Sequence, residues 1–249
     1  MYGQRLRVLS LATAATLLAA YALVFFYAPN DADQGFVQKI FYLHVPMAIV
    51  ALCGFIFAGI MAIQHLRTGD RGDDLRSYVA IHLSLILAVG VLLTGAIWAK
   101  ASWGHWWVWN EPTLVSFLIV FLLYATYQPL RFSIEDPERQ SRYASVFAVT
   151  AGAFVPLNFL AVRLAQGFVH PRVLGTTGGN MPGSMRLTFL VALAGMVLLF
   201  VTLWKYELAS KHASMQLRAL RRRLLAEEEA VAEGDEALVS RRSAAPQHV

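Results

Sequence analysis

The sequence is short of charge and nearly without cysteine. Of its 249 residues only 15% are charged, whereas 57% are hydrophobic. An ordinary soluble domain carries about 25% charged residues, so this composition argues against that class and indicates an integral membrane protein. The single cysteine, Cys53, lies in an apolar run, which excludes an internal disulfide and thiol relay chemistry by this chain alone. We expect Cys53 to be a small buried hydrophobe.

Several functional signatures are also missing. The sequence has no internal repeat, no phosphate-binding glycine loop and no nucleotide motif, so any energy source must come from another subunit. It has no closely spaced set of cysteine and histidine, which ranks structural zinc low. The net charge of +5 reflects membrane topology and a basic tail, and we predict no nucleic-acid partner.

What the sequence does contain is six apolar segments of membrane-spanning length, each free of Lys, Arg, Asp and Glu. A span needs roughly 20 mostly apolar residues, and its backbone must satisfy its own hydrogen bonds, so each segment is predicted to be a helix. The fold class is therefore an all-α integral membrane six-helix bundle in residues 1–204. The first segment is too long for a signal peptide, and we interpret it as a retained helix. The segments are Val8–Tyr27, Leu43–Gln64, Tyr78–Trp98, Leu114–Leu130, Tyr143–Val162 and Leu187–Trp204.

Basic residues predict the orientation, because cytoplasmic loops are richer in Lys and Arg. Before the distal tail is counted, one side holds Arg5, Arg7, Arg67, Arg71, Arg76, Arg131, Arg139, Arg142, Lys205 and Lys211. The other side holds Lys39, Lys100, Arg163, Arg172 and Arg186. Both termini are then cytoplasmic.

Residues 205–249 form a charged tail of different character. Leu217, Leu220 and Leu224 recur at helical spacing among arginines, and Glu227–Glu229 follow. This pattern predicts an amphipathic helix that runs into a disordered end. Two roles stay open for it, a solvated or membrane-surface helix and a docking helix for a cytoplasmic partner.

The most informative segment is a run of tryptophans on a predicted outer loop. Trp103, Trp106, Trp107 and Trp109 fall within the eight residues from Trp103 to Asn110, between two apolar segments. Tryptophan is common at membrane interfaces, but four in one short loop exceed what anchoring needs. They predict a platform for a large planar apolar ligand.

Two histidines lie on the same predicted side as this platform. His44 opens the second span ahead of Pro46, which suits a first helical turn, and His170 stands before Pro171 in the last outer loop. Imidazole is a good axial ligand for haem iron, and two imidazoles would occupy both axial positions. We therefore predict His44 and His170 as haem ligands, although either could be a structural residue. His105, within the tryptophan run, could ligate or anchor its loop.

Three arginines on this outer side need a reason, since outer loops should be poor in them. Arg163 and Arg186 flank the loop that carries His170, and Arg172 follows it by two residues. We hypothesise that some of them pair with the haem propionates; interfacial snorkelling is the alternative. For Asn158, near Pro156 in the fifth span, we favour a helix kink or an interhelical hydrogen bond.

The tryptophan run resembles the tryptophan-rich segment of the haem-handling proteins of cytochrome c maturation. His44-Val45-Pro46 and His170 fall where that family keeps two haem-ligating histidines, and the length and six spans resemble its CcmC branch. The resemblance covers Met1 to about Trp204. It implies that His44 and His170 are axial ligands of haem b, the transferred ligand, and that the four tryptophans contact the macrocycle.

The resemblance also implies partners and a place. Such proteins hold haem at the outer leaflet of the bacterial inner membrane and deliver it to a periplasmic haem chaperone of the CcmE type. A small membrane helper (CcmD type) and an ABC transporter pair (CcmA and CcmB type) accompany them. The sequence departs from the family at Asn110, where an Asp is usual, and at Pro112, where a basic residue is often found. Asn110 should keep the helix-capping geometry, and Glu111 would supply the acidic charge.

The leading prediction is thus a haem-binding transfer protein, not an enzyme. One alternative is a quinol-oxidising haem oxidoreductase, which is disfavoured because the candidate histidines lie at one surface. The other is a transporter or exporter subunit for haem, although the spans carry no buried charge that would mark an ion pathway.

Overall fold

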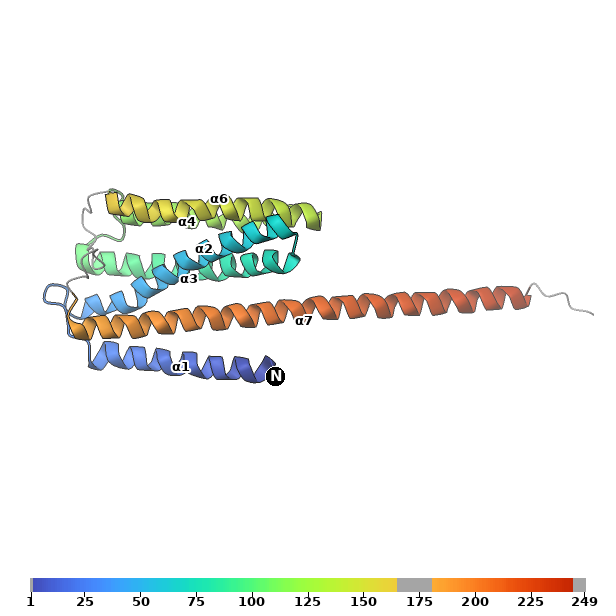
Figure 1. Ribbon diagram of the computed structural model, residues 1–249, viewed down its shortest axis with the longest axis horizontal. Helices are drawn as coiled ribbons and strands as arrows, with labels where there is room; N and C mark the ends of the chain where they lie inside the picture. Colours follow the sequence, from blue (N-terminus) through green and yellow to red (C-terminus); the bar gives the residue numbers. More distant parts are fainter. Residues whose placement is uncertain (1, 165–180, 244–249) are drawn as a thin grey trace, which may run out of the picture. The chain divides into compact units, whose positions relative to one another are not determined.

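The computed structural model describes the backbone of residues 2–164 and 181–243, and the side chains of residues 4–160 and 181–227. All the secondary-structure elements named within these ranges are helices. Six helices in the described part are long and apolar enough to cross a membrane. The predicted fold class, an all-α membrane bundle, is therefore confirmed. The helices run as α1 (Tyr2–Phe26), η1 (Phe36–Ile40), α2 (Phe41–Thr68), α3 (Arg71–Trp103), α4 (Pro112–Ala125), α5 (Tyr127–Phe132), α6 (Pro137–Leu164) and α7 (Gly183–Ser243) (Figure 1).

The chain divides into two compact units, Met1–Tyr206 and Glu207–Val249. The first unit contains helices α1 to α6 and the part of α7 that ends at Tyr206. In the second, helix α7 continues to Ser243, as the predicted charged tail helix requires, and Glu207 pairs with Lys211 at 3.5 Å. Three leucines of this tail helix are exposed on it: Leu217, Leu220 and Leu224.

The helices extend beyond the apolar runs because polar residues cap them. Helix α2 ends at Gly69, whose φ of 74° suits glycine, and Asp70 begins α3 by accepting a hydrogen bond from the Gly72 amide at 2.8 Å. The loop between these two spans therefore shrinks to Gly69 and Asp70. Hydropathy gives no signal for such ends, since Arg71 and Asp74 are as helical as the residues that follow them.

The fourth span is interrupted at Thr126, between α4 and α5. Pro129 has no amide hydrogen to offer the carbonyl four residues earlier, so the helical ladder breaks there. The Thr126 hydroxyl donates to the Leu123 carbonyl oxygen at 2.7 Å, which satisfies one acceptor near the break.

The core of the first unit uses small residues where helices approach closely. A methyl group at Gly59 of α2 would lie 3.6 Å from the Ala148 carbonyl oxygen of α6. Phe55 and Tyr124 stack at 3.8 Å between ring centroids, and Thr13 of α1 and Thr202 of α7 share a 2.8 Å hydrogen bond. Without a hydrophobic force between helices in lipid, such close packing and side-chain bonding hold a bundle together.

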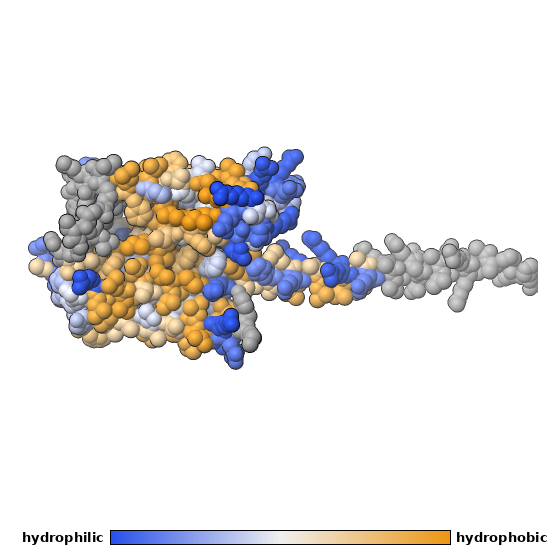
Figure 2. All heavy atoms as spheres, in the orientation of Figure 1, coloured by the Kyte–Doolittle hydropathy of each residue, from blue (hydrophilic) through white to orange (hydrophobic). Residues whose placement is uncertain are grey.

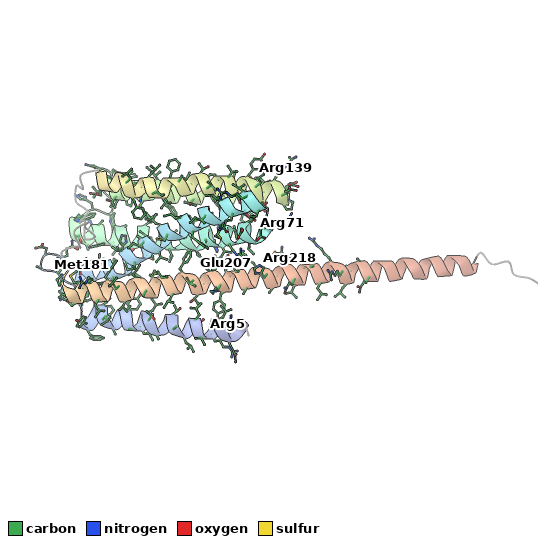
Figure 3. All side chains as sticks on the ribbon, in the orientation of Figure 1. Arg5, Arg71, Arg139, Met181, Glu207 and Arg218 are labelled. Atoms are coloured by element: carbon green, nitrogen blue, oxygen red, sulfur yellow. The ribbon has the colours of Figure 1, made fainter. Side chains whose placement is uncertain are left out.

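Charged residues gather toward one end of this unit, where Figure 3 labels Arg5, Arg71 and Arg139, while Met181 lies at the other end. Figure 2 shows apolar side chains over the intervening surface. The prediction that Cys53 is buried is wrong, because its side chain is exposed. An apolar residue on a membrane helix gains as much from lipid as from the bundle interior, so hydropathy cannot tell the two apart.

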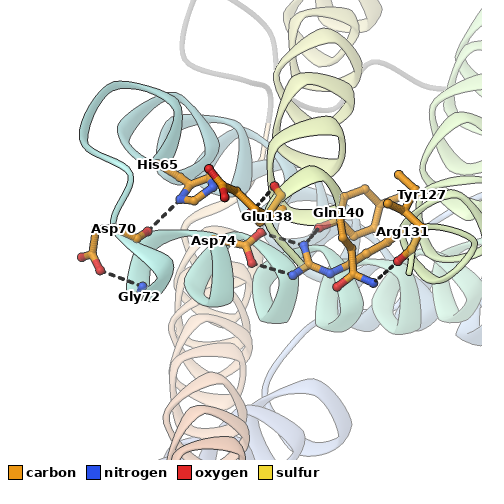
Figure 4. Close-up of polar contacts among 10 residues, drawn as sticks. His65, Asp70, Gly72, Asp74, Tyr127, Arg131, Glu138 and Gln140 are labelled. Carbon is orange, nitrogen blue, oxygen red and sulfur yellow. Dashed lines mark hydrogen bonds and ion pairs between the residues drawn. The ribbon is translucent and has the colours of Figure 1, made fainter. Parts of the chain in front are cut away.

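At the arginine-rich end, Arg131 and Asp74 form a bidentate ion pair that joins α5 to α3 (Figure 4). Their two N–H···O distances are 2.7 and 2.6 Å, and Arg131 also donates to the Tyr127 hydroxyl at 2.9 Å. The guanidinium lies 5.0 Å from the centre of the Tyr78 ring. This pair fastens the short α5 segment to the bundle below the break at Thr126.

Candidate functional site: a cavity at the tryptophan end

A cavity of about 240 Å³ opens at the end of the first unit where α3 ends and α4 begins, which we call the tryptophan end. Helices α2, α3, α4 and α6 contribute to its wall, and in the described part of the chain none of the lining residues is Lys, Arg, Asp or Glu. Its lining is mainly aliphatic and aromatic, with a few polar side chains that include His44, Thr113 and Asn158. An apolar cavity with a few polar groups is the usual form of a small-molecule site.

His44 is held in this wall by a side chain of the neighbouring helix. Its Nδ1 lies 2.9 Å from Thr94 Oγ1, which in turn lies 2.7 Å from the Gly90 carbonyl oxygen. The threonine has one hydrogen, which the Gly90 carbonyl takes, so Thr94 Oγ1 accepts from His44 Nδ1–H. This tautomer places the imidazole lone pair on Nε2, the nitrogen suited to bind a metal.

The His44 ring is also fixed by its packing. The Trp98 ring packs edge to face with it at 5.7 Å between centroids, and Trp98 Nε1–H donates a 2.8 Å hydrogen bond to Gln34 Oε1. On α3, a Cβ at Gly95 would lie 2.9 Å from His44 Cε1, so the ring occupies space that only glycine leaves. The imidazole cannot swing toward α3 without a clash.

Pro46 does not lie in the first helical turn, as the sequence suggested. The helix begins at Phe41, directly after η1, so Pro46 lies inside α2 and His44 is its fourth residue. The sequence did not predict the short helix η1, because Phe36–Ile40 mixes polar and apolar residues and precedes the apolar segment.

The tryptophan run is bent, so its four rings do not share one surface. Gly104, with φ of 76°, ends α3 and turns the chain. Trp103 and Trp107 line the cavity, whereas Trp106 and Trp109 are 60% and 72% exposed. The Trp107 and Trp109 rings meet edge to face at 5.9 Å. Two rings thus belong to the cavity and two face outward.

The helix cap expected at Asn110 belongs to its neighbour. Asn110 is exposed in a turn, while Glu111 is fully buried and accepts a hydrogen bond from the Thr113 amide at 3.4 Å. Pro112 explains the shift, because proline favours the first helical position and makes the residue before it the cap.

The structure describes only some of the remaining predicted site residues. His170 and Arg172 lie outside the described residues. Arg163 lies in α6 with its side chain outside the described range, and Arg186 is an exposed residue of the first turn of α7. His105 is exposed in the tryptophan loop. The structure therefore brings together His44, Trp103 and Trp107.

Sequence reasoning undervalued Asn158. Its side chain lines the cavity and is 8% exposed, and its Oδ1 has no hydrogen-bond partner among the described residues. The interhelical bond that we favoured is thus not made by this atom. The available signal was a polar residue inside a membrane span, which often marks function.

These features define a class: a multi-pass helical membrane protein with a preformed apolar cavity at one end and an oriented histidine in its wall. Comparison with known proteins identifies it further. The chain belongs to the heme exporter protein C (CcmC) family, whose model matches residues 1–223.

Individual relatives agree over most of the chain. A heme exporter protein C of Rhodobacter capsulatus is 29% identical over 214 residues, which cover 85% of this chain and 88% of the relative. One of Bradyrhizobium diazoefficiens is 32% identical, with 79% and 72% covered. A protein of Marchantia polymorpha named as a putative cytochrome c biosynthesis ccmC-like mitochondrial protein is 30% identical, with 72% and 75% covered.

Proposed function

We propose that this protein binds haem at the tryptophan end and delivers it for cytochrome c biogenesis, without an enzymatic turnover of its own. The observation that carries the proposal is His44, whose Nδ1 is bonded to Thr94 in the wall of an apolar cavity. The names of the relatives support the cargo and the pathway, since they speak of a heme exporter and of cytochrome c biosynthesis.

In this proposal haem is cargo, and His44 Nε2 would be one axial ligand of its iron. A metal-binding histidine usually donates its other N–H to a fixed acceptor, which orients the ring and raises its basicity. Thr94 Oγ1 has that position here. His170, which lies between α6 and α7 in the sequence, is proposed as the second axial ligand.

The rest of the site would hold the macrocycle. Trp103 and Trp107 offer aromatic contact within the cavity, and the exposed Trp106 and Trp109 would cover the haem from outside or meet a partner. Asn110 lies beside this exposed pair in the same loop and would share that role. We propose that Arg163, Arg172 and Arg186 supply cations for a propionate that reaches the surface.

The partners follow from the family and from what the sequence lacks. An ABC transporter pair of the CcmA and CcmB type would supply the ATP-driven step, because this chain has no nucleotide motif. We propose that a periplasmic chaperone of the CcmE type accepts haem b and that a CcmD-type helper joins the complex. The multi-pass chain would lie in the inner membrane with the tryptophan end facing the periplasm and both termini in the cytoplasm.

The test is the absorption spectrum of the purified protein in lipid nanodiscs after loading with haem. We expect the wild type to show sharp reduced bands of bis-imidazole haem, and His44→Ala and His170→Ala each to shift them. His212→Ala, in the tail helix, is the matched control and should leave them unchanged. A wild-type protein that retains no haem after loading with excess haem and removal of the free haem would refute the proposal.

A further inference from the structure

Two buried polar atoms of residues that line the cavity have no hydrogen-bond partner in the described part of the chain. Asn158 Oδ1 and Trp107 Nε1 are both inaccessible to solvent, and neither has a hydrogen-bond partner within the described ranges. Both residues line the same cavity as His44. Leaving a buried polar group unpaired is unfavourable, so such atoms in a binding cavity point to a group of the ligand.

The chemistry of the two atoms restricts what that group can be. Trp107 Nε1–H can only donate, and Asn158 Oδ1 can only accept. A single group that satisfies both atoms presents one acceptor and one donor. A protonated carboxyl group does so with its carbonyl oxygen and its hydroxyl.

The cavity wall favours the protonated form over the carboxylate. Among the described residues that line it, none is Lys, Arg, Asp or Glu, and most are aliphatic or aromatic. A carboxylate buried there without a cation would be strongly unfavourable, and such a group takes up a proton instead.

We propose that one of the two carboxyl groups of haem enters this cavity in neutral form, donating to Asn158 Oδ1 and accepting from Trp107 Nε1. Asn158 is then a binding residue that fixes the rotation of the macrocycle about the His44–iron axis. The other carboxyl group remains for the arginines. This inference rests on the proposed function, because it names the contacts of the same ligand.

The experiment compares two ligands against two variants. Haem and haem dimethyl ester are titrated into nanodisc-embedded wild type, Asn158→Leu and Trp107→Phe, and dissociation constants are read from the Soret band. The ester keeps its carbonyl acceptor but has no hydroxyl to donate. We therefore expect Asn158→Leu to weaken haem binding roughly tenfold and ester binding hardly at all, since one hydrogen bond is lost only with haem. Trp107→Phe should weaken binding of both ligands.

The matched control is Thr150→Val, a polar change on the exposed face of the same helix, which should alter neither constant. Equal loss of haem and ester in Asn158→Leu would overturn the proposal and favour a bridging water, and an unchanged haem constant would overturn it as well. A retained His44-ligated spectrum in the variant shows that the site is still folded. Failure of the proposed function looks different, because the wild type itself would bind no haem.

Discussion

Thr94 Oγ1 lies 2.9 Å from His44 Nδ1, across the contact between α3 and α2. The same hydroxyl is held by its own helix at the Gly90 carbonyl, so the acceptor cannot rotate away from the imidazole without losing that bond. The histidine is thereby fixed in tautomer and direction before any ligand arrives. Preorganisation of this kind lowers the entropic cost of binding.

Removing the hydroxyl should weaken haem binding while leaving the helices in place. We expect Thr94→Val to lower haem affinity by roughly ten- to a hundredfold, the usual effect of losing the group that orients a metal ligand. Thr94→Ser keeps the hydroxyl and should bind as the wild type does. The measurement is a Soret titration. Equal affinity of the valine and serine variants would show that Thr94 does not orient His44.

A methyl group added at Gly95, next to the His44 imidazole, should also weaken haem binding, in this case through a steric clash. In Gly95→Ala the new Cβ would lie 2.9 Å from His44 Cε1, and the ring is packed against Trp98 on another side. We expect haem retention after purification to fall severalfold. Gly90→Ala is the control on the same helix, because its Cβ would meet the flexible side chain of Met47. Comparable loss in both variants would indicate general damage to α3.

The split of the tryptophan run predicts two separable phenotypes. Trp103→Ala and Trp107→Ala should each weaken haem binding about tenfold, because their rings line the cavity. Trp106→Ala and Trp109→Ala should bind haem within about twofold of the wild type but transfer it more slowly to a chaperone, since these rings are exposed. Titration and a transfer assay with purified chaperone separate the two. Similar binding losses in all four would restore the single platform expected from the sequence.

The sequence predicted the spans well because each is a long run without charge, and lipid imposes helicity on such a run. It could not predict the turn at Gly104, around which two of the tryptophans line the cavity and two are exposed, because all four are the same residue type. Nor could it place Asn158 of α6 and Trp107 of the tryptophan loop in the wall of the same cavity. The His44–Thr94 bond joins residues fifty positions apart. Such contacts depend on helix rotation, which hydropathy in a membrane leaves undetermined.

The buried ion pair at the arginine-rich end should matter for stability and not for haem. Asp74→Ala would leave the buried Arg131 guanidinium without its carboxylate partner, and breaking a buried ion pair in this way typically destabilises by about 3–5 kcal/mol. We expect a clearly lower melting temperature, and partial recovery in the double variant Asp74→Leu with Arg131→Met. Asp73→Ala breaks a pair with the half-exposed Arg76 and should change stability by less than about 1 kcal/mol. An unchanged melting temperature in Asp74→Ala would show that the Arg131–Asp74 ion pair does not stabilise the bundle.

The orientation that the charges predict for the bundle can be tested with single cysteines. In a Cys53→Ala background, Asn110→Cys reports on the tryptophan end and Ser133→Cys on the arginine-rich end; both positions are exposed. Because the basic residues should face the cytoplasm, a membrane-impermeant maleimide should label Asn110→Cys in intact spheroplasts and Ser133→Cys only after permeabilisation. Native Cys53 lies within a span and should resist the reagent in either state, which checks that lipid shields the exposed surface of the helices. The reverse labelling pattern would place the cavity on the cytoplasmic side and rule out delivery of haem to a periplasmic chaperone.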